Sequence, residues 1–178
     1  TFHGFDHANI PAEGRLGARL RAPLWKKVED WGLRRQRHII SITPYVREQL
    51  AGRTPAIIYD IDNPLQAAYF DVEPRTIPGR VFFAGWITPR KNPLTLVEAF
   101  ARLIATGMDA TLHLAGEEKD PAYSKQVRDA IARHGLGERV RMLGRVGPDE
   151  IRRQLSEAAL FVLPSLQENA PMAIAEAQ

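Results

Sequence analysis

The chain has 178 residues, of which 44% are hydrophobic and 25% charged, with a formal net charge of +3 and no cysteine. This composition is typical of a soluble globular protein, and it excludes disulfide bridges, thiolate metal sites and an intrinsically disordered chain. No apolar run approaches the roughly 18 residues of a membrane-spanning helix. Without cysteines the compartment stays open, and cytoplasm is the default expectation. The chain starts with Thr rather than Met and ends inside a helical pattern, so we expect a fragment.

The first seven residues, TFHGFDH, contain three candidate metal ligands: His3, Asp6 and His7. Two histidines four apart would meet on a helix, but Gly4 disfavours a helix here and no third strong ligand follows nearby. We therefore predict no metal site.

A helix is predicted from Arg15 to Gln36, interrupted at Pro23, with an apolar face that includes Trp25 and Trp31. Eight basic residues lie between Arg15 and Arg37. The favoured interpretation is a helix that packs in the core and exposes its basic face. The alternative is a helix that lies on anionic lipid with its tryptophans at the interface. No motif supports nucleic-acid binding.

An expected strand (37–42) is followed by a short helix that Thr43 caps, and then by a second strand (56–59). The acidic triplet Asp60-Ile61-Asp62 resembles a metal-binding D-x-D sequence. We do not assign it that role, because such triplets are common and this one adjoins a proline turn.

From Arg80 onward the pattern alternates regularly between strands and helices. Strands alternating with helices through short loops predict an α/β fold with a doubly wound parallel sheet and ligands at the carboxyl ends of the strands. The G-x-G-x-x-G fingerprint is missing, which argues against a NAD dehydrogenase. The strands are expected at 81–85, 111–115, 140–143 and 160–163, and the helices between 92 and 107, 120 and 135, and 147 and 157.

Two cations, Arg90 and Lys91, stand immediately before the helix that Asn92 and Pro93 open. Cations are disfavoured at a helix N-terminus by about 0.3–1 kcal/mol each. Two together indicate that an anion completes the site, although Arg90 could also be a solvated loop residue.

The last stretch, 160–178, combines a strand, a polar loop and a helix that starts near Pro171, an arrangement that suits an anionic group. Glu168 and Glu176 bracket the helix start and would be on the order of 10 Å apart. The alternative is structural: Ser165 and Glu168 have capping-box spacing, and Glu176 could be a solvated surface residue.

Pro164-Ser165 followed by Glu168 and Glu176 resembles the E-x7-E signature of retaining glycosyltransferases of the GT-B fold, specifically family 4. The resemblance implies that Glu168 holds sugar hydroxyls and that Glu176 holds the ribose of a nucleotide-diphosphate sugar. It also implies that Lys91 binds the diphosphate. The remaining contacts that it implies come from Arg90, from the backbone at Leu143, Asn169 and Ala170, and from His3, which touches the donor sugar from the other domain.

Three departures from that family stand out. Trp86 occupies the position of an Arg that grips the diphosphate, Gln66 replaces an Asp in the segment between the domains, and residues 169–171 replace glycines. A non-catalytic nucleotide-sugar-binding module is therefore the competing interpretation. A phosphorylase of related fold would need a cofactor lysine on a segment that this chain does not contain.

The resemblance predicts that residues 1–76 are the end of an acceptor-side domain with the interdomain linker, and that 77–178 form most of a Rossmann-like donor-binding domain. It implies a metal-independent glycosyltransferase without a cofactor, and we expect the fragment to be inactive alone. Its partners would be the sugar donor and a glycan, lipid-linked or small-molecule acceptor, with no nucleic acid. Peripheral contact with the inner face of the membrane through Arg15 to Arg37 is the alternative to core packing of that segment.

Overall fold

The computed structural model describes the backbone from Leu16 to Gln178 and the side chains from Pro23 onward. The described residues form two compact units, each with a parallel sheet and helices, so the predicted α/β class is confirmed. The smaller unit contains the described residues up to Pro64 together with 167–171, and the larger unit contains 65–166 and 172–178. His3, Asp6 and His7 lie outside the described residues.

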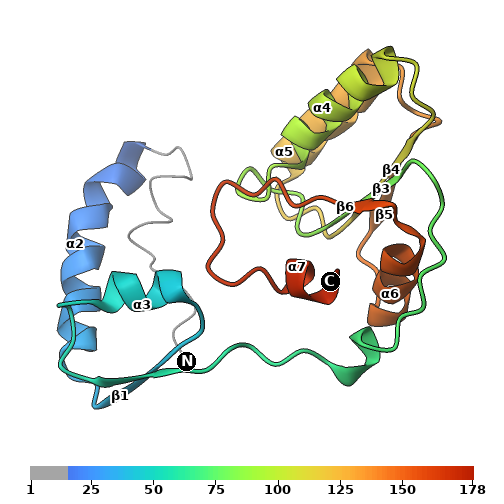
Figure 1. The fold of residues 1–178 in the computed structure, drawn as a ribbon. Coiled ribbons are helices and arrows are strands. Elements are labelled where there is room, and N and C mark those ends of the chain that lie inside the picture. Colours follow the sequence, from blue (N-terminus) through green and yellow to red (C-terminus); the bar gives the residue numbers. More distant parts are fainter. Residues whose placement is uncertain (1–15) are drawn as a thin grey trace. The chain divides into compact units, whose positions relative to one another are not determined.

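The smaller unit is built on two parallel strands and two helices (Figure 1). Its small apolar core consists of Leu33, Ile39, Ile42, Val46 and Leu50. The elements are α2 (Leu16–Leu33), β1 (His38–Ser41), α3 (Pro44–Leu50) and β2 (Ile57–Asp60), with His38 paired to Ile57 in the register.

The cap that the sequence predicts for α3 is present. The Thr43 hydroxyl accepts a hydrogen bond from the Val46 backbone N–H at 3.3 Å, and Pro44 occupies the first helical position. Gly52 follows the helix with a φ of +69°, a conformation that favours glycine. A polar residue, a proline and a glycine therefore set the bounds of this helix.

Two expectations for α2 were wrong. The helix continues through Pro23, because the missing N–H removes one helical hydrogen bond without ending the others. Its apolar face is not packed in the core: Leu24, Trp25, Val28 and Trp31 are exposed. A two-stranded sheet offers little surface to cover, and among the described side chains of α2 only Leu33 is buried.

The larger unit is a four-stranded parallel sheet in the order β5-β4-β3-β6. Strands were predicted at all four places, although the last ends earlier than expected, since Pro164 cannot donate to a ladder. The elements are η2 (Ala67–Tyr69), β3 (Arg80–Ala84), α4 (Pro93–Ala105), β4 (Thr111–Ala115), α5 (Pro121–Arg133), β5 (Val140–Gly144), α6 (Pro148–Glu157), β6 (Leu160–Phe161) and α7 (Met172–Glu176).

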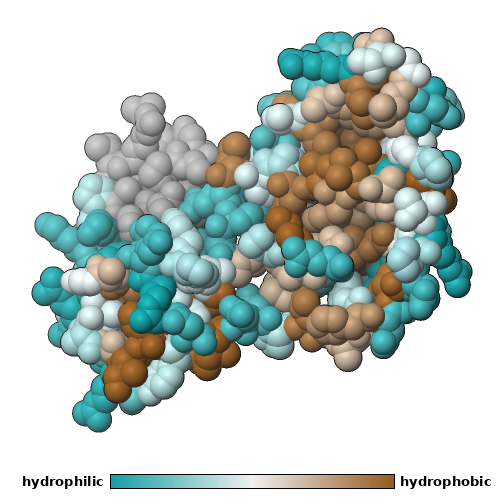
Figure 2. All heavy atoms as spheres, viewed as in Figure 1, coloured by the Kyte–Doolittle hydropathy of each residue, from teal (hydrophilic) through white to brown (hydrophobic). Residues whose placement is uncertain are grey.

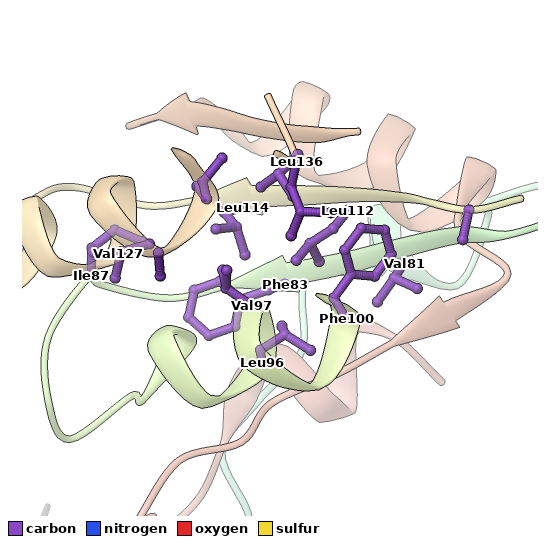
Figure 3. Packing of buried hydrophobic residues seen from close by; sticks show 14 of the residues in the cluster. Val81, Phe83, Ile87, Leu96, Val97, Phe100, Leu112, Leu114, Val127 and Leu136 are labelled. Carbon is purple, nitrogen blue, oxygen red and sulfur yellow. The ribbon is translucent and has the colours of Figure 1, made fainter. Parts of the chain in front are cut away.

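The two faces of this sheet are covered differently. Helices α4 and α5 cover one face, and α6 covers the other (Figure 1). The face under α4 and α5 is apolar throughout, with Phe83, Val97, Leu112 and Val127 fully buried (Figure 3). Apolar residues also reach the surface of both units, as the brown patches in Figure 2 show.

The face under α6 contains a buried polar contact between His113 of β4 and Gln154 of α6. Gln154 Nε2 donates to Glu150 Oε1 at 2.9 Å, so its Oε1 faces His113 and accepts from His113 Nδ1 at 2.7 Å. Burial lowers the pKa of His113, and the nearby Arg80 and Arg141 lower it further, while the bond to Gln154 opposes the shift. His113 is therefore a neutral donor in the fold.

The segment expected as an interdomain linker packs with the larger unit. The backbone N–H groups of Arg75 and Ile77 donate to the carbonyls of Ser156 and Glu157 at the end of α6, at 2.8 and 2.9 Å. The division between the units falls at Pro64, whereas the sequence placed the boundary after residue 76. Backbone pairing with a distant helix end is not visible in a proline-rich sequence.

Candidate functional site

The strand order of the larger unit defines where a ligand would bind. The chain runs outward from β3 through β4 to β5, and then returns to place β6 on the other side of β3. In open α/β sheets, ligands bind at the carboxyl ends of the strands where the order reverses in this way. The reversal lies between β3 and β6, so the loops that follow these two strands are the candidate site.

Glycines bring the carboxyl ends of β3, β4 and β5 close together. A Cβ atom on Gly116, which has a φ of +155°, would lie 1.8 Å from the Gly85 carbonyl oxygen, so no side chain is possible there. Gly85 N–H donates to Ala115 at 2.9 Å, and Gly116 N–H donates to Gly144 at 2.8 Å. The result is an edge where a ligand can approach the backbone closely.

Lys91 is positioned at this edge by its aliphatic stem. Its Cδ and Cγ atoms lie 3.5 and 3.7 Å from the place that a Cβ atom on Gly85 would occupy. Arg90 is fixed through its backbone, because its carbonyl accepts from the N–H of Leu166, in the loop after β6, at 2.8 Å. The two loops at the reversal point are thus joined directly.

The start of α4 differs from a simple anion site. Asn92 at the N-cap has a φ of +55° and makes no side-chain cap, and Pro93 has no N–H. The next N–H, of Leu94, donates to the buried Tyr123 hydroxyl at 3.2 Å. Burial raises the pKa of Tyr123, which keeps this hydroxyl neutral. Part of the donor capacity of the helix end is therefore already used within the protein.

The predicted site residues fall into both units. Lys91, Arg90 and Leu143 lie in the larger unit near the carboxyl ends of β3 and β5. Glu168 and Asn169 belong to the 167–171 segment of the smaller unit. Ala170, in the same segment, packs against that unit's core. His3 lies outside the described residues.

The capping-box alternative for Ser165 and Glu168 is wrong, because α7 begins only at Met172. The hydroxyl of Ser165 is buried and has no hydrogen-bond partner within the protein. Ser165 and Glu168 thus lie in the loop between the end of β6 and the start of α7, several residues before the helix.

Glu176 lies on α7 in a cavity of about 450 Å³ within the larger unit. Burial raises the pKa of its carboxyl group. Tyr69 also lines the cavity, and its pKa is raised by burial and by the charge of Glu176. Glu176 is thus a half-buried carboxylate rather than a solvated surface residue. The other lining residues are Leu65, Phe70, Val72, Pro74, Thr76, Leu155, Ser156, Ala158, Ala175, Ala177 and Gln178.

The sequence prediction missed Lys119, which follows β4. Its Nζ lies 5.6 Å from the centre of the Trp86 ring and 2.9 Å from Glu117 Oε1. The pairing of β3 with β4 brings these residues together, and no motif in the sequence marks it. Within the part of the chain that the structure describes, no three His, Asp or Glu side chains cluster in a way that could hold a metal ion.

A parallel sheet with a reversal point, in a chain that also contains a second α/β unit, is found in part of a GT-B glycosyltransferase fold. The family described as Glycosyl transferases group 1 matches residues 78–178, more than half of the chain. The chain belongs to this family.

Individual relatives agree with that assignment. The chain is 26% identical over 166 residues to a 2-deoxystreptamine glucosyltransferase from Streptomyces kanamyceticus, covering 84% of this chain and 42% of the relative. It resembles the structure of a sucrose-phosphate synthase from Thermosynechococcus elongatus with a TM-score of 0.68 and 23% identity, covering 99% of this chain and 46% of that one.

A second structure, Alr3699/HepE from Anabaena, was solved in complex with UDP-glucose. It resembles this chain with a TM-score of 0.70 and 17% identity, over 86% of this chain and 46% of that one. At such identities the structures show the shared fold alone. The chain spans less than half the length of each of these three relatives.

Proposed function

We propose that this chain is part of a retaining glycosyltransferase of family 4 that uses a nucleotide-diphosphate sugar, with residues 77–178 as its donor-binding domain and residues 1–76 as the end of its acceptor-side domain. The observation that carries the proposal is Lys91, held against Gly85 at the reversal point of the sheet in a chain of this family. A lysine there can neutralise the charge that develops on the leaving diphosphate, which is electrostatic stabilisation of the transition state. Cytoplasmic location and a role in polysaccharide biosynthesis are part of the proposal.

The other roles are those that the resemblance to family 4 implies. Glu168 holds the sugar hydroxyls, Glu176 holds the ribose, and Arg90 assists Lys91. His3 contacts the sugar from the acceptor-side domain. Leu143, Asn169 and Ala170 contribute backbone contacts, and no metal or cofactor is required. Transfer is by front-face attack: the acceptor oxygen bonds to the anomeric carbon as the bond from that carbon to the diphosphate oxygen breaks. The hydroxyl proton passes to the leaving diphosphate on the same face, and no enzyme nucleophile takes part.

The test is transfer of labelled sugar by the whole protein, with UDP-glucose as the first donor. Lys91→Ala should lower the transfer rate by about 100- to 1,000-fold, as expected for loss of one stabilising charge. Lys125→Ala is the matched control, since Lys125 is an exposed lysine of α5 paired with Asp129. A Lys91→Ala enzyme as fast as the Lys125→Ala enzyme would rule out the assigned role of Lys91.

Glu176 needs its own test, because it is half buried and its loss could affect folding. Glu176→Gln keeps the volume and removes the charge. We expect weaker donor binding with an unchanged melting temperature. Donor binding as tight as in the wild type would show that Glu176 does not hold the ribose.

A non-catalytic nucleotide-sugar-binding module is the second candidate. Trp86 is half exposed, at the position where the resemblance to family 4 implies an Arg, and this substitution favours the module. Calorimetric binding of the donor without transfer to glycans, lipid-linked sugars or aminocyclitols would support the module. Transfer to any of these acceptors would exclude it.

Peripheral membrane contact through α2 is also proposed. Leu24 and Trp31 are 65% and 60% exposed, and the guanidinium of Arg35 lies 3.7 Å from the centre of the Trp31 ring. Each basic residue close to an anionic surface contributes about 1 kcal/mol. No helix in the described part of the chain is long and apolar enough to cross a bilayer.

Sedimentation of the whole protein with phosphatidylserine vesicles at low salt tests this contact. Replacing four basic residues near the exposed face by Gln should abolish pelleting, whereas the same number of replacements in the larger unit should not. Equal pelleting of both variants would disprove attachment through α2. The first set is Lys26, Lys27, Arg34 and Arg35, and the control set is Lys125, Arg128, Arg133 and Arg139.

A further inference from the structure

We propose that Lys119 binds the diphosphate of the donor together with Lys91, and that Trp86 is the platform that holds Lys119 in place. This inference rests on the proposed function and deepens it, because it assigns a second cation to the diphosphate subsite. It concerns a loop, 117–120, that no sequence motif marks.

The first step is the position of Trp86. The residues on either side of it are tied to the neighbouring strand and its loop: Gly85 N–H donates to Ala115 at 2.9 Å and Ile87 N–H donates to Glu117 at 3.0 Å. Ile87 is 1% exposed and sits at the end of the apolar core, near Val127 in Figure 3. Trp86, 52% exposed, is therefore held on the outside of a fixed backbone.

The second step is the position of Lys119. Its ammonium group lies 5.6 Å from the centre of the Trp86 ring, a cation–π distance. Glu117 Oε1 accepts from the same ammonium at 2.9 Å, and the Lys119 N–H donates to the Glu117 carbonyl at 3.0 Å. An indole and a carboxylate together restrict a side chain that would otherwise be mobile.

The third step is the relation to Lys91. Gly85 and Trp86 are consecutive, and the Lys91 stem packs against the first while Lys119 lies over the second. Two lysines from different loops thus flank the carboxyl end of β3. A diphosphate offers several anionic oxygens, so it can accept from two separate ammonium groups at once.

The carboxylates around Lys119 have other partners besides Lys119. Glu117 is shared, because Lys119 lowers its pKa most and Arg145 lowers it further. The neighbouring carboxylates are used elsewhere: Glu118 pairs with Arg128, and Asp120 accepts from the Tyr123 N–H at 3.0 Å as the cap of α5. Lys119 and Arg145 therefore share Glu117, and the charge of Lys91, on the other side of the β3 end, adds to the attraction for an anionic ligand.

The test compares nucleoside diphosphates with nucleoside monophosphates. Binding of UDP, GDP, ADP and TDP, and of the matching monophosphates, to the whole protein is measured by calorimetry. Lys119→Met keeps the stem that covers Trp86 and removes the charge. We expect about tenfold weaker binding of the diphosphate that the wild type prefers, with little change for its monophosphate. Lys119→Arg should retain most of the affinity, and Lys125→Met, the control on α5, should retain all of it.

The outcomes separate this inference from the proposed function. If the wild type binds none of the four diphosphates, the proposed function fails. If the wild type binds one of them and Lys119→Met binds it equally well, the inference about Lys119 is overturned and the proposed function stands. Equal weakening of diphosphate and monophosphate would also overturn it, because Lys119 would then act by general attraction. Melting temperatures of the variants show whether the exposed substitution has disturbed the fold.

Discussion

The two units of the chain are stabilised in different ways. The larger unit buries a continuous apolar core between its sheet and the helices α4 and α5. The smaller unit buries few apolar residues and relies on polar contacts, such as those that Arg53 makes with α2. A four-stranded sheet offers two faces for helices to cover, whereas two strands cannot remove much surface from water. The difference predicts that the larger unit is sensitive to cavities and the smaller one to the loss of individual polar bonds.

The largest effect is expected from a cavity in the larger unit. Phe100 of α4 is 3% exposed inside the apolar core. Phe100→Ala should lower the free energy of unfolding by about 3–5 kcal/mol, through lost burial and the cavity left behind. Urea unfolding followed by circular dichroism measures it. Phe70→Ala is the control, since Phe70 is 75% exposed. Equal losses in the two variants would contradict this picture of the core.

In the smaller unit, the next largest effect should come from Arg53. Its Nε donates to Asp30 Oδ1 at 2.6 Å and its Nη2 to Glu29 Oε2 at 3.4 Å, joining the segment after α3 to α2. Arg53→Ala leaves these partly buried carboxylates without that partner, at a cost of about 1–3 kcal/mol. Arg47→Ala, which removes an exposed pair with Asp60, should cost well under that. Protection of the Ile39 amide from hydrogen exchange reports on this unit. If the Ile39 amide is as well protected in Arg53→Ala as in Arg47→Ala, the contacts of Arg53 with α2 do not stabilise this unit.

The helix cap of the smaller unit comes next. Thr43→Ala removes the bond to the Val46 N–H and should cost about 1 kcal/mol. Thr43→Ser keeps the acceptor and should lose much less. The amide of Leu50, at the end of α3, reports on both variants by hydrogen exchange. If Ser proves as damaging as Ala, the cap is not what Thr43 contributes.

The smallest expected effect is a difference between the two units in how their stability depends on pH. The pKa of His113 is lowered from its ordinary value of 6.5, so the unfolded chain takes up this proton first, and the larger unit loses stability as the pH falls below about 6.5. The pKa of Asp30 in the smaller unit is lowered from 3.8, chiefly by the bond from Arg53, so its contribution persists until the pH falls below that value.

At pH 5, exchange protection corrected for intrinsic rates should therefore fall at Leu112 and hold at Ile39. His113→Asn should flatten the response at Leu112. A response at Leu112 that is the same with and without His113 would assign the acid sensitivity to another group.

Local signals accounted for the parts of the fold that the sequence predicted well. Thr43, Pro44 and Gly52 set the bounds of α3 by their own backbone preferences, and the strand pattern from 81 to 115 follows from consecutive apolar residues. Lys91 was found because a cation before a helix start is unusual within a short window. Helix bounds and strand positions that depend on only a few neighbouring residues can therefore be predicted from a single sequence.

The predictions that failed depended on distant partners. The apolar face of α2 was expected in a core, but whether such a face is buried depends on how much sheet lies beneath it. The boundary between the units was expected after residue 76, but the backbone at Arg75 and Ile77 pairs with the end of α6. Composition describes a residue's preference for burial and does not say whether a surface exists to bury it.

The sequence by itself determined the alternation of strands and helices, the glycines that end the strands, and the place of Lys91 just before the start of α4. Only the tertiary structure decided that β6 lies beside β3, and thus where the order of the sheet reverses. It also placed Lys119 over Trp86, more than thirty residues earlier in the chain. The physical reason is that local conformation depends on neighbours along the chain, whereas strand order and side-chain contacts depend on which surfaces the whole chain can bury together.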